Sequence, residues 1–292
     1  MVKESKILEL VKDADGFGIA DLQKEFSLGF SEAVELLDRM EVQGVIEKDG
    51  TKKPTIYRVK GIEIIAKIEK YKGKVLPICG RPGIGQESIS LQMALNYYKF
   101  TSKAVIIFSP HQTKREIQMR LVSIRDGYNY YWAKSKTSPT RTVERFNGYV
   151  RGMDFSQPNV DDNENITEEY FVSQIENTED IGMVVMLDYD FYSDKLSVDL
   201  LKKIAEQMRI PIIVDCLVNR EVEDREDCHP RREDMKSAEL SKMDTVLLVY
   251  RESYYDLDST DTTTELIIDE GETKKAVMLR YVVSRLKFYD MK

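Results

Sequence analysis

Five short apolar runs rich in β-branched residues constrain the fold of this chain more than any other feature. They start after residue 73, and segments with helical periodicity separate them. Such runs suit parallel strands covered on both faces, and their alternation with helices predicts repeated βαβ units. The runs are VLPIC (75–79), AVIIF (104–108), GMVVML (182–187), IPIIV (210–214) and TVLLVY (245–250). We therefore expect an α/β domain over residues 73–292, with the polar stretch 154–169 as a surface loop.

Residues 1–60 have a different pattern, typical of a small helical domain. Apolar stripes predict a first helix near Ile7–Val11 and a second over Ile19–Phe26. A third helix is expected to begin after Ser31, its N-cap, and to end at Gly44. Two short strands around Asp49-Gly50 predict a hairpin. Three helices and a β-wing make a winged helix-turn-helix domain. The stretch 20–50 resembles the winged-helix γ domain of FtsK-type DNA translocases. Residues 61–72 are expected to form a linker helix.

The surface of this domain leaves two interpretations open. A DNA-reading third helix needs Arg, Lys, Asn or Gln on its outer face, but here carboxylates dominate it and Arg39 is the main cation. The carboxylates are Glu32, Glu35, Asp38 and Glu41. The wing is more basic and carries Lys48, Lys52, Lys53 and Arg58. Residues 1–60 are therefore either a DNA-binding module, through Arg39 and the wing, or a protein-contact or dimerisation module.

Composition restricts the class of partner and compartment. The 292 residues include 43 basic and 51 acidic residues, so a net charge of -8 argues against coating nucleic acid by bulk charge. No apolar stretch reaches the ~20 residues of a membrane span, and the charged N-terminus lacks a secretory signal. Three widely spaced cysteines suit a reduced compartment, and with two histidines they predict no metal site. A cytoplasmic protein is expected.

The segment after the first apolar run has the position of a phosphate-binding loop. Cys79-Gly80-Arg81-Pro82-Gly83-Ile84-Gly85-Gln86-Glu87-Ser88 follows a strand and opens a helix. Gly80, Gly83 and Gly85 would let the backbone wrap a phosphate at the helix N-terminus. The P-loop motif calls for Lys and then Ser or Thr after the last glycine. This chain has Gln86 and Glu87 there, so a charge and a Mg²⁺-binding hydroxyl are missing.

The order of segments from residue 73 onward resembles the C-terminal RecA-like ATPase domain of DnaB-family replicative DNA helicases. The similar segments are 105–123, MVVMLDYDFY (183–192), 201–235, 244–255 and 265–281. The resemblance covers nearly all of residues 73–290 and implies a RecA-like P-loop NTPase fold, with Asp188 at the end of the Walker B strand.

The residues that differ from the family's pattern stand at the positions that carry out catalysis in the family. Gln86 and Glu87 replace the P-loop Lys and Thr or Ser, and His111 stands where the resemblance puts the carboxylate that polarises water. Leu217 replaces the polar sensor, and Glu270 and Glu272 lie where the family supplies basic fingers. Of the family's set, Asp188 remains, so we assign no catalytic residue. The degenerate nucleotide-site positions are Gly80, Arg81, Gly83, Gly85, Gln86, Glu87, His111 and Asp188.

Three functions stay open from the sequence. The first is a non-hydrolysing, pseudo-ATPase accessory of DNA replication or recombination that binds DNA, a replicative helicase or further copies of itself, without ATP or Mg²⁺ as cofactor. The second is a divergent ATP-dependent helicase in which Arg81, or Lys114 and Arg115, replaces the missing Lys. The third is a winged-helix DNA-binding regulator with an oligomerising RecA-like domain.

Three other regions are candidates for contact with single-stranded nucleic acid. Tyr128, Tyr130, Tyr131 and Trp132 lie beside Lys134 and Lys136, a combination that either stacks on bases or packs against a partner. The loops at 144–152 and 220–236 carry several arginines. In the second, carboxylates alternate with the arginines, which favours a solvated or interface loop over a phosphate track.

Overall fold

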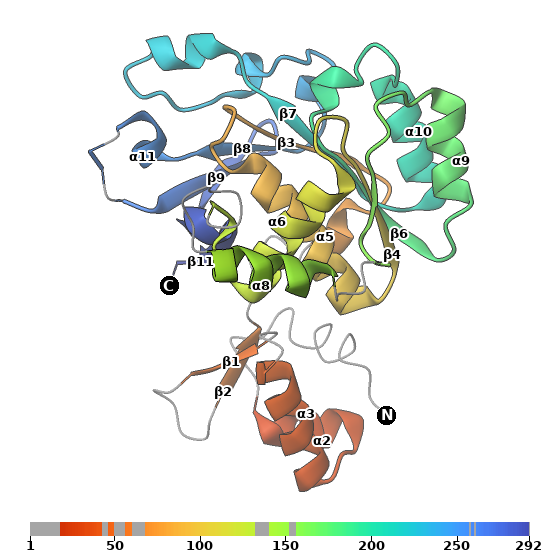
Figure 1. The fold of residues 1–292 in the computed structure, drawn as a ribbon, viewed down its shortest axis with the longest axis vertical. Helices are drawn as coiled ribbons and strands as arrows, with labels where there is room; N and C mark the ends of the chain where they lie inside the picture. The colour runs from red at the N-terminus through yellow and green to blue at the C-terminus, as the bar shows by residue number, and fades with distance from the viewer. Residues whose placement is uncertain are drawn as a thin grey trace. The chain divides into compact units, whose positions relative to one another are not determined.

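The computed structural model describes residues 18–42, 46–49, 56–59, 68–131, 140–151, 156–256, 258–259 and 261–291. The chain divides into two compact units, Met1–Lys67 and Ile68–Lys292, and the division falls within the stretch expected to be a linker. Figure 1 shows both units, which are described separately below. None of the helices in these ranges combines the length and the apolar character that crossing a membrane requires.

The described part of the first unit holds two helices and a hairpin (Figure 1). Helix α2 (Ile19–Phe26) and helix α3 (Phe30–Val42) pack through buried Leu22, Ala33 and Leu37. Strands β1 (Ile46–Asp49) and β2 (Ile56–Val59) are antiparallel, with Ile46 opposite Val59. The expected second helix and hairpin are therefore present. The first predicted helix and Gly44 lie outside the described residues. Of the Asp49-Gly50 turn, only Asp49 is described.

Two boundaries in this region differ from expectation. Helix α3 begins at Phe30, one residue before the predicted cap Ser31, because the Gly29 N–H donates to the Glu32 carboxylate at 2.9 Å. The described end of the predicted linker helix is a short 3-10 helix, η1 (Ile68–Tyr71). Ile68 and Tyr71 are buried in the second unit, and Lys70 pairs with Glu270 at 3.1 Å.

The second unit is built on a nine-stranded sheet with the order β11-β10-β9-β8-β3-β7-β6-β4-β5. Strands β8, β3, β7, β6, β4 and β5 run parallel, and β9, β10 and β11 extend the sheet antiparallel. The parallel strands are β3 (Val75–Gly80), β4 (Ala104–Phe108), β5 (Asn159–Asp161), β6 (Ile181–Met186), β7 (Ile212–Leu217) and β8 (Val246–Tyr250). The others are β9 (Thr263–Asp269), β10 (Lys274–Val282) and β11 (Lys287–Asp290). The expected α/β, RecA-like architecture is confirmed.

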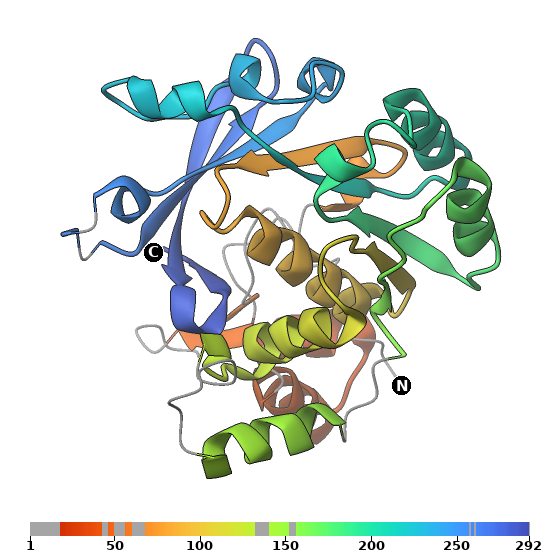
Figure 2. The same ribbon diagram turned by 45° about the horizontal axis from the view of Figure 1, so that its top comes forward.

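Helices cover both faces of the parallel strands (Figure 2). Helix α5 (Gln86–Thr101) and helix α6 (Lys114–Asp126) lie on one face, with α8 (Thr140–Arg151) beyond them. Helix α9 (Glu168–Glu176) and helix α10 (Val198–Met208) lie on the other. Phe171 of α9 packs on Phe108 of β4 with ring centroids 4.9 Å apart. The two-sided cover explains why these strands read as continuous apolar runs rather than alternating ones.

Two features of the sheet differ from expectation. The stretch 154–169, expected to be a loop, contains the three-residue edge strand β5, which pairs with β4. Its sequence Asn-Val-Asp has no apolar run, so only its place beside β4 makes it a strand. Cys79 and Cys216, expected to be reduced, form a disulfide, because they lie opposite each other on β3 and β7 with Cα atoms 4.8 Å apart.

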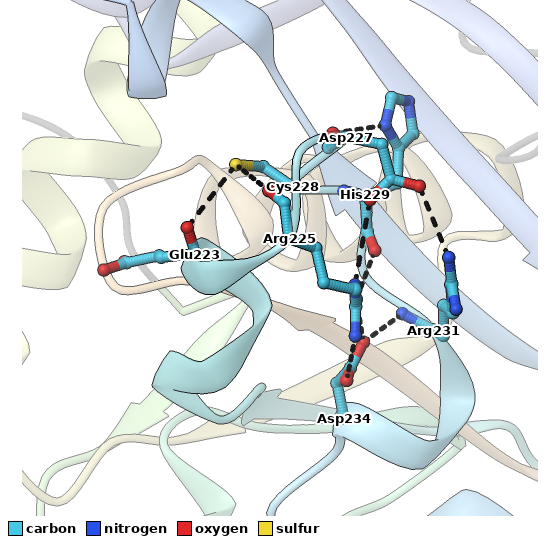
Figure 3. A network of polar contacts seen from close by, with 7 residues as sticks. All are labelled: Glu223, Arg225, Asp227, Cys228, His229, Arg231 and Asp234. Carbon is cyan, nitrogen blue, oxygen red and sulfur yellow. Dashed lines mark hydrogen bonds and ion pairs between the residues drawn. The ribbon is translucent and has the colours of Figure 1, made fainter.

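The segment between β7 and β8 folds into short 3-10 helices held by ion pairs. They are η3 (Arg220–Asp224), η4 (Arg232–Asp234) and η5 (Leu240–Lys242). Arg225 binds the Asp234 carboxylate at 2.6 and 2.8 Å and also donates to the His229 carbonyl, and Arg231 pairs with Asp227 (Figure 3). The described ranges of the second unit also contain the short helices η2 (Tyr189–Phe191), α11 (Glu252–Tyr255) and η6 (Val283–Arg285).

Arg232 attaches this segment to the sheet. Its guanidinium pairs with the Asp269 carboxylate at 2.8 Å and donates to the carbonyls of Ser241, Met243 and Asp269. The Asp269 side chain is almost fully buried, so its charge depends on partners inside the protein.

We predict that Arg232→Ala lowers the free energy of unfolding by about 3 kcal/mol, because it leaves a buried carboxylate whose remaining contacts among the described residues are the Lys274 ion pair and the Gly271 N–H. Urea titration of both proteins would measure the difference. Arg220→Ala is the matched control, since that side chain is mostly exposed and should change stability by less than about 0.5 kcal/mol. Equal effects of the two substitutions would contradict the assignment.

Candidate nucleotide site

The degenerate positions predicted from the sequence meet at the carboxyl edge of the parallel sheet. The loop 81–85 connects β3 to α5, His111 follows β4, and Asp188 follows β6. Ligands of open α/β sheets bind at this edge, outside the carboxyl ends of the strands. The structure therefore brings the P-loop residues, His111 and Asp188 to one region, although they are far apart in the sequence.

The glycine-rich loop has the backbone of a phosphate-binding loop but closely packed surroundings. Gly83 and Gly85 have φ values of 82° and 126°, a region that side chains disfavour. A Cβ atom on Gly85 would lie 2.8 Å from the Phe288 ring, so β11 packs directly on this glycine. Ile84 is fully buried and Gln86 is only 5% exposed. The Gln86 side chain therefore lies inside the protein, not in solvent above the loop.

Glu87 forms an ion pair in the first turn of α5. Its carboxylate lies 3.1 Å from the Arg120 guanidinium of α6, and the Gln112 amide donates to its other oxygen. Both charged side chains are about four-fifths buried, so water screens the pair weakly. Arg120 also lies 5.0 Å from the centre of the Tyr130 ring. The position that would offer a Mg²⁺-binding hydroxyl thus holds a carboxylate, and the protein's own Arg120 already balances its charge.

Arg120 is a site residue that the sequence analysis missed. It stands in the largely apolar stretch IQMRLVSI (117–124), where its neighbours Met119 and Leu121 are buried. Burial tends to lower the pKa of its guanidinium, but the charge of Glu87 and the Tyr130 hydroxyl raise that pKa overall. A lone arginine inside a buried helical stretch is a signal that a carboxylate lies opposite, since buried charges are normally paired.

Asp188 and His111 follow different strand ends of the same edge. Asp188 caps η2 in a left-handed conformation, with φ 51°. Burial raises the pKa of its carboxyl group, and the nearby charges of His111 and Arg120 partly offset this. His111 is exposed and packs edge-on against Phe191, with ring centroids 4.6 Å apart. The next acidic residue, Asp190, accepts a bond from the Leu217 N–H at 2.9 Å, so its carboxylate is fixed to β7.

Asp215 is a second residue that the sequence analysis did not identify. It lies in the middle of β7, is only 1% exposed, and its Oδ1 has no hydrogen-bond partner among the described residues. Burial raises the pKa of this carboxyl group well above its usual value, and the charges of Glu87 and Asp188 raise it further. The region beneath the loop is therefore crowded with carboxyl groups.

The loop itself is fixed from the side of β7 and β8. Arg81 pairs with Glu223 of η3 at 2.8 Å and donates to the Val218 carbonyl at 3.2 Å. The Tyr254 hydroxyl donates to the Pro82 carbonyl at 3.1 Å. The Arg81 guanidinium is mostly buried in this pair and does not extend over the loop.

The remaining predicted residues are separate from this cluster or outside the described side chains. Glu270 and Glu272 lie at the exposed β9–β10 turn. Arg39, Lys48 and Arg58 belong to described elements, but their side chains are outside the described set, as are residues 52–53 and 132–139. The DNA-binding expectation for these positions remains a prediction. The arginines at 220, 225, 231 and 232 all pair with carboxylates, so this loop offers few free cations to phosphates.

Comparison with known sequences places this arrangement in a family. Residues 70–290 match the DnaB-like helicase C terminal domain, so the chain belongs to that family. A "Probable replicative DNA helicase" of Trieres chinensis is 24% identical over 246 residues, 75% of this chain and 53% of the relative. The "Replicative DNA helicase DnaB" of Haemophilus influenzae is 23% identical over 284 residues, 79% of this chain and 57% of the relative. The chain therefore spans about half the length of these relatives.

Solved structures show the same fold. A structure whose title describes an "ATPase Domain" is similar with a TM-score of 0.65 at 20% identity, over 90% of this chain and 99% of that one. A structure titled "The Structure Of A DnaB-Like Replicative Helicase And Its Interactions With Primase" also has a TM-score of 0.65, at 19% identity, over 99% of this chain and 78% of that one. The residues Gln86, Glu87 and His111 are thus set in a fold that these structures share.

We predict that Asp215→Asn stabilises the protein at neutral pH. Burial raises the pKa of this carboxyl in the folded protein, so it holds its proton to higher pH than the unfolded chain, whose carboxyl ionises near pH 3.8. Stability is therefore lost as pH rises from 3.8 through the raised pKa, and a neutral amide avoids that loss. The Tm at pH 7.5 should rise by roughly 2–4 °C, the shift that about 1 kcal/mol produces in a domain of this size.

Thermal unfolding of both proteins between pH 4 and pH 8 would measure this effect. The advantage of the variant should be near zero at pH 4 and grow with pH. Asp194→Asn, which changes an exposed carboxylate, controls for the change in net charge. A Tm difference that does not depend on pH, or a variant less stable at pH 7.5, would count against an ionisation penalty at Asp215.

Proposed function

We propose that this member of the DnaB-like helicase family is a pseudo-ATPase, which keeps the RecA-like fold as a binding scaffold and does not hydrolyse ATP. The observation that carries the proposal is the Glu87–Arg120 ion pair at the start of α5. The site supplies its own counter-charge there, at the position where nucleotide-binding members of this motif class place a Mg²⁺ ligand.

The side chains at the loop do not fit a Mg²⁺-bound triphosphate. Gln86 brings no positive charge, and its side chain is buried near Gly80. Glu87 and Asp188 add carboxyl groups near the place where an anion would sit. Arg120 is the cation facing them, and Glu87 already holds it. A triphosphate would therefore face repulsion and would have to break an existing, weakly screened ion pair.

The expected loss of catalysis is large. A basic finger alone is worth about 10³–10⁵ in rate in phosphoryl-transfer enzymes, and the P-loop Lys and a water-positioning residue add to this without being independent of it. Here Gln86 lacks the charge, and exposed His111 packs on Phe191. The β9–β10 turn carries Glu270, which is paired with Lys70. We expect hydrolysis close to the uncatalysed rate.

The divergent-helicase alternative depends on a substitute for the missing Lys. Arg81 is held by Glu223 and the Val218 carbonyl, so recruiting it would break both contacts. Arg115 donates to Asn147, and the backbone N–H of Lys114 donates to Asp162, at the exposed start of α6. The side-chain contacts of Arg81 and Arg115 favour the pseudo-ATPase over rescue by either arginine, while the bond of Lys114 fixes its backbone and not its side chain.

The biological role proposed is that of an accessory in DNA replication or recombination, binding DNA, a replicative helicase or both. Its relatives carry the names of replicative DNA helicases, and one similar structure is titled for a helicase and its interactions with primase. A protein with the fold but without hydrolysis could associate with such assemblies as a structural subunit. A regulator that binds specific DNA through the winged helix is the remaining alternative, and a sequence-specific footprint would favour it.

The direct test of this proposal is the ATPase rate of the pure protein with Mg²⁺, with and without single-stranded DNA. We expect no turnover above the buffer blank. Asp188→Ala is the control, since contamination by another ATPase would leave the rate of both proteins equal. Turnover that is lost in Asp188→Ala would contradict the proposal.

Restoring the motif should restore nucleotide binding. The double variant Gln86→Lys with Glu87→Thr supplies the missing charge and hydroxyl and frees Arg120 from its carboxylate partner. We expect calorimetry to detect Mg²⁺–ATP binding to this variant at least tenfold tighter than to the parent protein, about 1.4 kcal/mol or more. Gln86→Lys alone should gain less, because the Glu87–Arg120 pair remains. If the double variant, folded as judged by circular dichroism, gains nothing, the two residues are not what prevents binding.

A further inference from the structure

A cleft opens at the amino edge of the central parallel strands, at the opposite end of these strands from the glycine-rich loop. Its volume is about 520 Å³, within the range of ligand-binding sites. Its walls come from the chain that enters β3, β6 and β7 and from the C-terminal ends of α5 and α10, which lie on opposite faces of the sheet (Figure 2). We call it the amino-edge cleft. A ligand bound here would not compete with one at the loop 81–85.

The lining of the amino-edge cleft is positively charged. Its described residues include three basic side chains and one carboxylate, namely Lys72, Lys103, Arg209 and Glu206. Lys103 lies 3.6 Å from Asp180, whose side chain is 67% exposed, so water weakens this ion pair. Arg209 forms no side-chain hydrogen bond or ion pair with any residue that the structure describes. In a protein with a net charge of -8, this excess of cations favours an anionic ligand.

The backbone at Arg209 adopts a conformation that usually selects glycine. Arg209 ends α10 with φ 53°, and its N–H donates to the carbonyl of Glu206. Helices commonly end on glycine in this left-handed conformation, because a side chain is strained there. A cation near a helix C-terminus also interacts favourably with the helix dipole, but a basic residue within the last turn would do so without the strain. The presence of arginine at this position therefore indicates a role for its side chain in the cleft.

A bulge in β6 shapes the floor of the cleft. Gly182 is the extra residue of β6 where its register with β4 shifts. A Cβ atom on Gly182 would lie 2.5 Å from the Lys103 Cβ and 2.7 Å from the Tyr97 ring. The glycine therefore lets both side chains cross the start of the strand, and it holds the stem of Lys103 at the cleft. Bulges of this kind commonly redirect side chains beside functional sites.

The cleft also has an apolar wall beside the cations. Met208 is 38% exposed, and Ile181 is partly exposed. Ile210 and Tyr97 complete this wall but are buried. A methionine side chain is flexible and adapts to apolar groups of different shapes. The lining thus suits a ligand in which carboxylate or phosphate groups stand beside an apolar group.

We propose that the amino-edge cleft binds an acidic peptide segment of a partner protein, in which an aliphatic side chain stands beside the carboxylates. The carboxylates would pair with Lys103 and Arg209, and the aliphatic side chain would pack on Met208. The Lys103–Asp180 pair shows that a carboxylate fits beside one of these cations. The proposal does not rest on the absence of ATP hydrolysis, because the cleft and the glycine-rich loop lie at opposite edges of the sheet.

A nucleic acid matches the cleft less well than an acidic peptide. Its phosphates would be attracted to the cations, but single-stranded bases bind proteins largely by stacking on exposed aromatic rings. Tyr97, the aromatic residue of the described lining, is 1% exposed and offers no face for stacking. The exposed apolar group is Met208 instead, and an aliphatic side chain would remove more of its surface from water than a phosphate would.

Fluorescence anisotropy of a fluorescein-labelled peptide, Glu-Asp-Glu-Leu-Leu, titrated with the full chain without nucleotide or DNA tests the proposal. We expect saturable binding that weakens as salt rises, because exposed charges are screened. Arg209→Gly should raise the Kd about fivefold, since it removes a cation that has no other partner. Its Tm should not fall, because glycine relieves the left-handed backbone.

Ser102→Gly is the matched control for this variant. Ser102 ends α5 with φ 59°, so glycine relieves the same kind of strain there without removing a charge, and the Kd should stay unchanged. Met208→Gln should weaken binding of the leucine peptide but not the weaker binding of Glu-Asp-Glu-Ala-Ala, which has no large apolar group to pack on Met208.

Three results would overturn the proposal. The first is no binding of the leucine peptide at millimolar concentration. The second is an equal Kd for Arg209→Gly and Ser102→Gly, which would mean that the peptide binds elsewhere. The third is displacement of the peptide by oligo(dT) at a concentration below that of competing unlabelled peptide, which would reassign the cleft to nucleic acid. None of these readouts depends on ATP.

Discussion

The ion pair between Glu87 and Arg120 determines what the carboxyl edge of this sheet can bind. It joins the first turn of α5 to α6 with an N–O distance of 3.1 Å, and it is mostly shielded from water. In a RecA-like fold this is the edge at which an anionic ligand would be recognised. Here a fixed carboxylate occupies that position, and the nearby arginine is committed to it. The backbone geometry of a phosphate-binding loop is retained. The charges beside it, however, are already paired with each other and leave no free cation of Arg120 for a phosphate.

The surrounding contacts support the same closed arrangement. Arg81 forms an ion pair with Glu223, and the Tyr254 hydroxyl donates to the carbonyl of Pro82 in the loop. The Phe288 ring packs on Gly85. Each contact fixes a part of the loop that a nucleotide would otherwise organise. Buried Asp215 adds a carboxyl group that is most stable when protonated. The charges of Arg81, Glu87 and Arg120 around the loop are therefore used for pairing within the protein.

Much of this fold could be predicted from the sequence because its central strands are continuous apolar runs. AVIIF became β4 without any change of boundary, and the glycine-rich loop lies between β3 and α5 as expected. Strand β5 could not be predicted, since Asn159-Val160-Asp161 has no strand pattern and depends on pairing with β4. The facing positions of Cys79 and Cys216 required the strand register, which residue spacing does not give.

The sequence predicted where the loop and strand ends of the candidate site lie, but it identified only some of the side chains that meet there. Gln86, Glu87, His111 and Asp188 were recognisable because each stands at a motif position. The partner of Glu87 was not, because Arg120 is on another helix and its role depends on how α5 and α6 pack. Asp215 directly follows the apolar run 210–214, and only the structure reveals that it is buried within β7, where the charges of Glu87 and Asp188 act on its carboxyl group.

The most direct measurement of the central claim is calorimetric titration of the parent protein with Mg²⁺–ATP at millimolar concentration. An internally satisfied, acidic site predicts no heat of binding beyond dilution. A saturable heat with one nucleotide bound per chain would contradict the account, because it would mean that the Glu87–Arg120 pair opens to admit a triphosphate.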